Sequence, residues 1–305
     1  MSSPLDQQDP LTGYFTPTSR TRAAMDRLSE FLPLAWKENH CLALPILGPP
    51  GCGKTQFVKR YHSLFERKYD RKLRALYIEV STRSFRTNVS VDFLMKLGDP
   101  NPRYGLLPQR FHRLAKLMTG KYDIVFLDEF HRLIDSNTQQ VEKDAADWVT
   151  FFLNAKICPL VIVGEMKCER VFVDSAQFEG RTWGTVEMRP FDWAYLPDRR
   201  EYQGLLMAWE QLLELAQHSG LGELDCALRC YVFSRGLMRQ TSHLLSTAAM
   251  IARSAGAPSI RREHLANAVD YLRVGFRAKQ PNPFLMDEVK PVPPAPMTLG
   301  DGDTK

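Results

Sequence analysis

Short apolar runs alternate with helical patterns over the first two thirds of the chain. Apolar residues recur at helical spacing over Arg20–Trp36, Leu107–Met118 and Val141–Leu153. The apolar runs that read as strands are Cys41–Leu47, Ala75–Val80, Ile124–Leu127, Leu160–Val163 and Thr185–Met188. Short buried strands separated by helices are typical of a parallel sheet covered on both faces. We therefore expect residues 20–193 to form an α/β domain with a doubly wound sheet.

The pattern changes after Pro190, where helical spacing continues without a convincing strand. Four helical segments follow, at Arg199–Gln217, Asp225–Phe233, Gln240–Ser254 and Arg261–Arg273. This change from strands and helices to helices alone predicts a separate second unit, a C-terminal helical lid subdomain over residues 194–278.

The two ends of the chain lack periodicity. Residues 1–19 are rich in Pro, Gly, Ser and Thr and are expected to form a flexible arm. Residues 279–305 contain six prolines, several acidic residues and few apolar anchors. Such a composition predicts a disordered tail, with a docking peptide as the alternative.

Composition narrows the function classes only slightly. The 305 residues carry a net charge of +5, which permits an anionic partner such as nucleic acid or a membrane surface without requiring one. The six cysteines show no CxxC pair, so free thiols are favoured over disulfides or zinc. No apolar run approaches the length of a membrane span, and the N-terminus does not resemble a signal peptide. We expect a soluble, cytoplasmic protein.

A phosphate-binding loop follows the first predicted strand. The segment GPPGCGKT matches GxxxxGK[ST] at every fixed position and opens a helical stretch. Its glycines let backbone N–H groups point at phosphates, while the lysine neutralises the β/γ oxygens and the threonine hydroxyl ligates Mg²⁺. The expected nucleotide contacts are Gly48, Pro49, Pro50, Gly51, Cys52, Gly53, Lys54, Thr55 and Gln56.

An acidic pair follows a second apolar strand. Asp128 and Glu129 come directly after Ile124–Leu127. In phosphate-loop enzymes such a pair holds the magnesium through water and polarises the attacking water. Thr55 and Asp128 are therefore the predicted metal ligands, and Glu129, Asp128 and Lys54 the predicted catalytic residues. ATP and Mg²⁺ are the expected substrate and cofactor.

An adjacent Asp-Glu pair and a helical C-terminal unit favour an oligomeric ATPase over a small-molecule kinase. In that class the next strand ends in a polar residue that senses the γ-phosphate, a position that Glu165 fills where Asn, Thr or Ser is more usual. Arg181 is the first choice for an arginine that reaches a neighbouring subunit's nucleotide, and Arg170 is the second. Arg239, one turn into its helix, is predicted to fold over the phosphates.

The order of these motifs resembles the TnsC/TniB family of AAA+ transposition regulators over about residues 20–275. The segments that carry the resemblance are GPPGCGKT, LDEFHRL, VIVGE, GRTWGTVEMRPFDW and SRGLMRQ. It implies an AAA+ P-loop NTPase that forms ATP-dependent rings or filaments around duplex DNA. It also implies that the protein links target selection to a TnsB-like transposase, with a TniQ-like adaptor as a further partner. Some relatives serve CRISPR-guided transposition, and no residue here decides that point.

Two basic stretches are candidates for DNA contact. Arg110, Arg113 and Lys116 share one helical face, and Thr119 and Lys121 follow it. Such a face can track phosphates with little sequence preference, although a solvated helix face is the alternative. The resemblance places channel-lining elements between the phosphate loop and the acidic strand, which leaves DNA contact and a solvated face equally open for this stretch. Arg83 and Arg86 form the second candidate.

Two rival functions fit part of the pattern. One is another AAA+ task on DNA, such as helicase loading or clamp loading. The other is a protein remodeller or signalling NTPase without a nucleic-acid partner, which would show no DNA-stimulated ATPase activity.

Overall fold

The computed structural model describes residues 11, 14–37, 42–69, 73–81, 88–134, 139–173, 178, 180–273 and 280–297. Contacts between residues divide the chain into two compact units. The α/β unit comprises residues 20–50 and 54–188, and the helical unit includes residues 14–19, 51–53 and 189–297. The division falls at residues 188/189, close to the boundary expected from the sequence.

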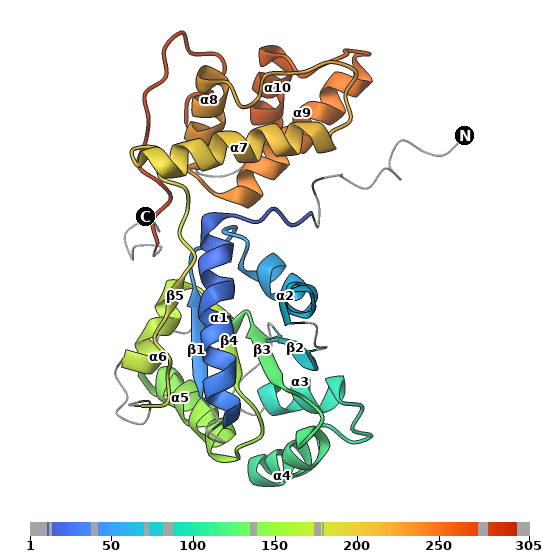
Figure 1. Ribbon diagram of the computed structural model, residues 1–305, viewed down its shortest axis with the longest axis vertical. Helices are drawn as coiled ribbons and strands as arrows, with labels where there is room; N and C mark the ends of the chain where they lie inside the picture. The colour runs from blue at the N-terminus through green and yellow to red at the C-terminus, as the bar shows by residue number, and fades with distance from the viewer. Residues whose placement is uncertain are drawn as a thin grey trace, which may run out of the picture. The chain divides into compact units, whose positions relative to one another are not determined.

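The α/β unit is built on a five-stranded parallel sheet (Figure 1). Its order is β2-β3-β4-β1-β5. The strands are β1 (Ala43–Leu47), β2 (Ala75–Glu79), β3 (Ile124–Asp128), β4 (Leu160–Gly164) and β5 (Val186–Glu187). All five were predicted, to within a few residues at their ends. Because every pair is parallel, the carboxyl ends of β1, β3 and β4 meet at one edge of the sheet.

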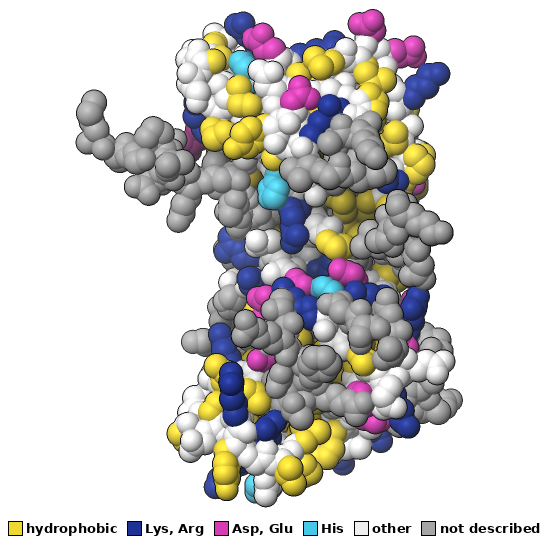
Figure 2. All heavy atoms as spheres, turned by 180° about the vertical axis from the view of Figure 1, so that it is seen from behind, with side chains coloured by type: hydrophobic (Ala, Val, Ile, Leu, Met, Phe, Trp, Pro, Cys, Tyr) yellow, Lys and Arg dark blue, Asp and Glu magenta, His cyan; other side chains and the backbone are white. Residues whose placement is uncertain are grey.

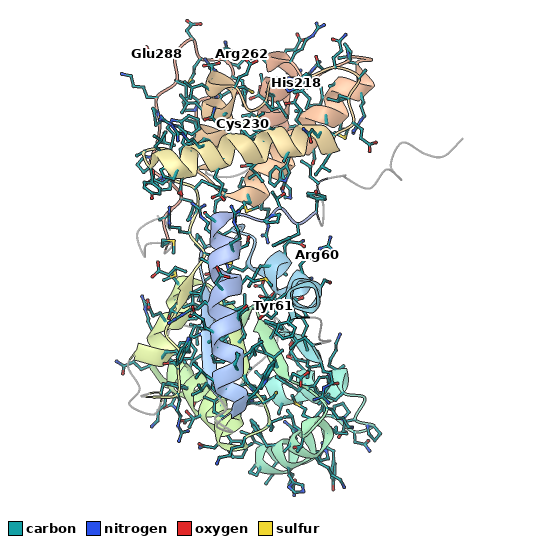
Figure 3. The ribbon with its side chains drawn as sticks, viewed as in Figure 1. Arg60, Tyr61, His218, Cys230, Arg262 and Glu288 are labelled. Carbon is teal, nitrogen blue, oxygen red and sulfur yellow. The ribbon has the colours of Figure 1, made fainter. Side chains whose placement is uncertain are left out.

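Helices cover both faces of this sheet. On one face α1 (Ser19–Lys37) and α2 (Lys54–Tyr69) pack together, and Tyr61 of α2 lies 5.8 Å from the Phe126 ring of β3 (Figure 3). On the other face Val125 and Leu127 join a core with α3 (Asn88–Lys96), α4 (Leu107–Met118) and α5 (Gln139–Asn154). Alternate residues of β3 thus face opposite layers, as in a doubly wound sheet.

Short helical turns follow two of the strands at the carboxyl edge. The 3₁₀ turn η2 (Phe130–Leu133) follows β3, and η3 (Met166–Glu169) with α6 (Arg170–Val173) follows β4. The sequence predicted α1, α2, α4 and α5, and α4 has the bounds predicted for it. It did not predict α3 or these short turns.

The helical unit contains the four helices expected from the sequence. They are α7 (Leu196–Leu212), α8 (Leu224–Ser234), α9 (Met238–Ser254) and α10 (Arg262–Leu272). Their apolar faces share one core, in which the Tyr202, Tyr231 and Trp193 rings contact one another. The buried Tyr202 hydroxyl is satisfied by the Ser234 and Thr241 hydroxyls.

Residues 280–297 form an extended strap against α8 and α10, in place of the disordered tail expected there. Phe284 is 2% exposed and belongs to the core of the helical unit. Arg262, labelled in Figure 3, donates to the carbonyls of Phe284 and Met286. The N–H of Ala295 donates to the Arg235 carbonyl. The buried Phe284 ring and the hydrogen bonds made by the backbone groups of the strap hold it in place despite its prolines.

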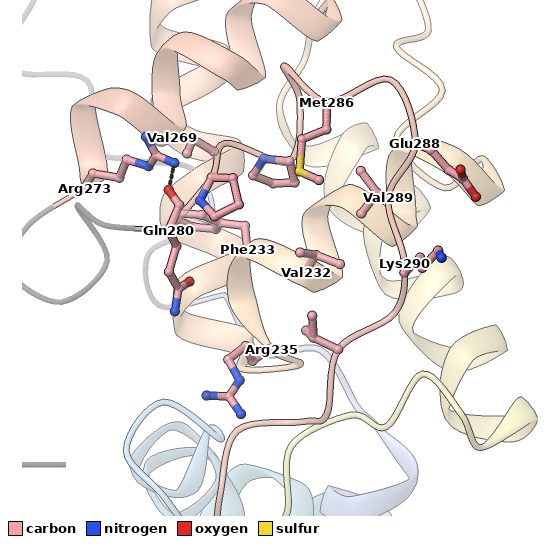
Figure 4. A pocket seen from close by; sticks show the side chains of 13 residues that line it. Val232, Phe233, Arg235, Val269, Arg273, Gln280, Met286, Glu288, Val289 and Lys290 are labelled. Carbon is pink, nitrogen blue, oxygen red and sulfur yellow. Dashed lines mark hydrogen bonds between the residues drawn. The ribbon is translucent and has the colours of Figure 1, made fainter.

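The strap encloses a cavity of about 490 Å³ within the helical unit (Figure 4). Its walls are mostly apolar, from Phe233 of α8, Val269 of α10 and Val289 of the strap. Arg273 donates to the carbonyl of Gln280 at its margin. None of the helices in the described part of the chain is both long and apolar enough to cross a membrane.

Candidate functional site

The phosphate loop leaves β1 in a conformation that only glycine allows. A Cβ atom on Gly48 would lie 2.1 Å from the Met188 carbonyl oxygen, so no side chain fits there. Gly51 and Gly53 have φ values of 90° and 88°, in the left-handed region that favours glycine. The motif glycines are thus explained by close packing at the first position and by backbone conformation at the other two.

Helix α2 begins at the lysine of the loop. Lys54 Nζ donates to the carbonyls of Gly48 (2.6 Å) and Pro49 (2.9 Å), which draws the ammonium over the loop. The first N–H groups of a helix have no partner within it, and they carry the positive end of the helix dipole. A loop ending in Lys54 and Thr55 at the start of a 16-residue helix is therefore suited to bind phosphates.

The acidic pair lies at the same edge of the sheet, with β4 between β3 and β1. Asp128 is 2% exposed, and two donors satisfy its carboxylate. Tyr77 of β2 donates its hydroxyl to Oδ2 at 2.5 Å, and the N–H of Glu129 donates to Oδ1 at 2.8 Å. Burial, followed by this bond to Asp128, raises the pKa of Tyr77 well above its ordinary value, so Tyr77 stays a donor at neutral pH.

Glu129 has a left-handed backbone, with φ 59° and ψ 32°. A glutamate in this region costs roughly 1–2 kcal/mol relative to a right-handed conformation. Such strain persists where the surrounding structure imposes it, and it is common at functional sites. The strained position ends β3 and starts the turn η2.

His131 links the ends of β3 and β4. Its Nε2 lies 3.4 Å from Glu129 Oε2 and 3.4 Å from Glu165 Oε1. Glu129 Oε2 is also 3.7 Å from Arg132 Nε, and Glu165 Oε2 is 3.6 Å from Lys167 Nζ. The two carboxylates are only partly exposed, so the cations and the imidazole compensate a local excess of negative charge.

The turn after β4 depends on a second tightly packed glycine. A Cβ atom on Gly164 would lie 2.7 Å from Cys168 Sγ. This close approach lets Glu165 follow the strand directly, opposite Glu129. Burial raises the pKa of the Cys168 thiol to about 12, which excludes it as a nucleophile at neutral pH.

The two predicted arginines differ in what surrounds them. Arg181 donates to the Asn154 side chain at 2.5 Å, and its carbonyl accepts from the N–H of Ala43, the first residue of β1. It therefore lies at the amino edge of the sheet, opposite the phosphate loop. In the helical unit, the N–H of Arg239 donates to the Gly51 carbonyl at 3.1 Å. The nucleotide roles of both residues remain predictions.

The arginines of α4 hold the preceding loop. Arg113 pairs with Asp99 at 2.9 Å and donates to the carbonyls of Asn101 and Tyr104. Arg110 donates to the Arg103 carbonyl at 2.7 Å. This role in holding the loop was not predicted, and within the described part of the chain it leaves Lys116 and Lys121 as the cations of the candidate set with no side-chain bond to the loop.

The remaining members of the α4 candidate set lie in and after the last turn of α4. Lys116, Thr119 and Lys121 are all exposed. Arg83 and Arg86 lie outside the described residues. Figure 2 shows Lys and Arg side chains interspersed with Asp and Glu on the face drawn, without one continuous basic stripe.

The donors at the carboxyl edge fit Mg²⁺ better than a structural metal. Among the described residues, no group of three or more His, Cys, Asp or Glu side chains is arranged to hold a metal ion. A nucleotide-bound Mg²⁺ requires only one or two protein oxygens beside phosphates and waters. The Asp128 carboxylate and the Thr55 hydroxyl are oxygen donors of that kind, and their roles as metal ligands remain predictions. All five cysteines in the described part of the chain are free thiols, as expected.

Two side chains of this site were missed by sequence reasoning or given a different role. Tyr77 carries no motif signal, because its partner is set by the pairing of β2 with β3. For His131, which follows the acidic pair, the sequence leaves two roles open, orienting Glu129 or capping the following helix, and favours the second; its distance to Glu165 depends on the neighbouring strand β4. The recurrence of polar residues just after two adjacent strands was the signal available for His131.

A family model described as bacterial TniB protein matches residues 12–186, which is more than half of the chain. No curated protein matches the sequence. The resemblance to TnsC/TniB proteins found in the motifs is therefore confirmed by a match that spans nearly the whole α/β unit.

Several solved structures share the fold. The Orc1 protein of Aeropyrum pernix in complex with DNA has a TM-score of 0.64 at 20% identity, covering 87% of this chain and 68% of that one. Cdc6p of Pyrobaculum aerophilum gives 0.62 at 18% identity, with 88% and 71% covered. A RuvB variant of Thermotoga maritima gives 0.52 at 17% identity, with 83% and 70% covered. The fold is that of AAA+ P-loop proteins, as predicted.

Proposed function

Since the chain belongs to the family of bacterial TniB proteins, we propose that it is an AAA+ ATPase that assembles on duplex DNA and regulates transposition. The assembly links target selection to a TnsB-like transposase, and a TniQ-like adaptor is the second partner. The observation that supports the ATPase most strongly is the meeting of the phosphate loop, Asp128 and Glu129 at one edge of the parallel sheet.

The residues of this edge have separate tasks in hydrolysis. The loop N–H groups and Lys54 bind the phosphate oxygens of ATP. The Thr55 hydroxyl and, through water, the Asp128 carboxylate would hold Mg²⁺, which would supply positive charge to neutralise those oxygens. Glu129 accepts a proton from the water that attacks the γ-phosphorus, and the products are ADP and phosphate. Glu165 faces the γ-phosphate side of this edge.

Two arginines complete the proposed site in the assembly. Arg181 lies far along the sheet from its own phosphate loop, which suits action on a neighbouring subunit's nucleotide. Arg239 would sense the bound phosphates within its own chain, and its backbone bond to Gly51 supports this assignment. Supplying an arginine in trans makes hydrolysis depend on assembly.

Electron microscopy with ATP and duplex DNA tests this proposal. We expect rings or filaments on DNA that require ATP and that persist in Glu129→Gln, because this variant binds ATP without activating water. Lys54→Ala should form none. A Glu129→Gln variant that turns over ATP at the normal rate would refute the catalytic assignment.

A different DNA task is the second candidate, favoured by the likeness to Orc1 and RuvB structures. The discriminating measurement is the ATPase rate with the transposase added. We expect the transposase to change the rate of the DNA-bound protein. A response to a replication protein instead would favour the second candidate, and no effect of duplex DNA would exclude both.

A further inference from the structure

One ring nitrogen of His131 lies at the same distance from the carboxylates of Glu129 and Glu165. Glu129 Oε2 and Glu165 Oε1 are each 3.4 Å from the same atom, His131 Nε2. The three side chains are 27%, 19% and 17% exposed for Glu129, Glu165 and His131, so water screens them only in part. Two carboxylates this close repel each other unless a donor lies between them.

The other ring nitrogen of His131 identifies its tautomer. Nδ1 is buried and has no hydrogen-bond partner among the described residues. A buried N–H without an acceptor is costly, whereas a bare ring nitrogen exposes no unpaired donor. The tautomer with hydrogen on Nε2 therefore fits best, and Nε2 is the ring nitrogen that lies 3.4 Å from an oxygen of each carboxylate. No bond to Nδ1 fixes the ring, so the carboxylates orient it.

The backbone makes this arrangement rigid on both sides. Glu129 has a left-handed conformation at the end of β3, and Gly164 packs against Cys168 at the end of β4. Arg132, the cation near Glu129, is itself held by Glu79 and by the Val80 carbonyl after β2. Among the described residues, His131 is the side chain that contacts both the Glu129 carboxylate and Glu165 after strand β4.

We propose that His131 is a positioning residue for the general base, a role that rests on the ATPase function proposed above. By sharing its Nε2–H between Glu129 and Glu165, it sets the direction of the Glu129 carboxylate. Glu165, which follows β4, is the anchor that holds the His131 ring from the other side. This role accounts for an acid at a position where the sequence predicted a γ-phosphate sensor.

Replacing His131 distinguishes positioning from packing. His131→Leu removes the donor but fills the space, and we expect kcat for ATP to fall about 10- to 100-fold while KM stays within about twofold. His131→Gln restores an N–H donor of similar reach and should recover most of kcat. The matched control is His112→Leu on the exposed face of α4, which should leave both constants unchanged.

The anchor is tested through Glu165. We expect Glu165→Ala to lower kcat, and the double variant with His131→Leu to be no slower than His131→Leu alone, because both changes break one linkage. The melting temperature is measured for each variant. A loss of activity that follows a lower melting temperature, with Gln no better than Leu at position 131, would show a packing role and overturn the proposal.

Other outcomes separate this inference from the proposed function. Wild-type protein that does not hydrolyse ATP, with or without duplex DNA, refutes the ATPase and this inference together. Active wild-type protein with His131→Leu at full kcat refutes the positioning role alone. A rise in KM without a fall in kcat would assign His131 to nucleotide binding and would also overturn it.

Discussion

The buried carboxylate of Asp128 illustrates what a single residue requires at this site. A carboxylate that is 2% exposed needs hydrogen-bond donors, and it has the Tyr77 hydroxyl and the Glu129 N–H. The same two bonds fix its orientation, so that a free lone pair can face a metal-bound water. Tyr77 thus orients the carboxylate that we propose to hold Mg²⁺ through water.

Tyr77→Phe should raise the Mg²⁺ concentration needed for half-maximal ATP hydrolysis by about 10-fold. The variant removes only the hydroxyl, so the ring packing and the Lys59 contact over it are retained. Magnesium titration of the ATPase rate measures the effect, with Tyr104→Phe, 77% exposed, as the control. An unchanged magnesium dependence would mean that Tyr77 does not orient Asp128.

The residues that the sequence predicted and those that it missed differ in where their signal lies. Lys54 ends the loop that follows β1, and Asp128 and Glu129 stand at the end of β3, so all three have fixed places in local motifs and the fold brings them to the expected edge. Tyr77 was missed, and Glu165 was predicted as a γ-phosphate sensor without its contact to His131. Both acquire their partners through strand pairing, which places β2 and β4 on either side of β3. No local pattern encodes such neighbours, so these contacts could not be predicted.

At the scale of elements, the strap shows why composition alone is an incomplete guide. Six prolines and several acidic residues predict disorder, since such a segment buries little apolar area. Its carbonyl groups nevertheless accept hydrogen bonds from arginines of α8 and α10. Proline removes a donor and leaves the carbonyl free, so a proline-rich segment suits partners that only donate.

Arg229→Ala should release much of the strap and lower the free energy of unfolding by about 2–3 kcal/mol. Arg229 is 3% exposed and donates to the carbonyls of Pro283, Met286 and Asp287. Chemical denaturation and limited proteolysis within residues 280–297 measure the effect, with exposed Arg200→Ala as the control. Equal stability and equal protease resistance would contradict the role given to Arg229.

The basic residues of α4 and of the segment after it fall into two groups, and we expect different effects when each group is mutated. Lys121 is exposed, so Lys121→Ala should weaken duplex binding and lower the salt slope of the binding constant by about 1. Arg113 is paired with Asp99, so Arg113→Ala should lower stability first. Binding measured over a range of salt concentrations tests this, and an unchanged slope for Lys121→Ala would remove it from the DNA contacts.

Helix α3 was not predicted because its propensity and its packing point in different directions. Its nine residues include Val89 and Val91, and β-branched residues have low helix propensity. Val89, Phe93 and Leu94 are buried in the α/β core, so packing rather than propensity stabilises the helix. Long, periodic helices such as α4 and α9 were predictable because their apolar stripes are complete.

At the scale of the whole molecule, parallel topology is what creates the site. The phosphate loop and the acidic pair are far apart in sequence, and the order β3-β4-β1 places them one strand apart at the same edge. The fold class and both structural units were predictable because each has its own periodicity. The strap was not, because it depends on side chains from another segment.

The central claim is that this edge binds a magnesium-chelated triphosphate. Calorimetric titration of the protein with ATP and Mg²⁺ tests it most directly, beside Lys54→Ala and the exposed control Lys143→Ala. We predict saturable heat at one nucleotide per chain for wild type and Lys143→Ala, and none for Lys54→Ala. No heat with any purine triphosphate, or equal binding by Lys54→Ala, would contradict the account.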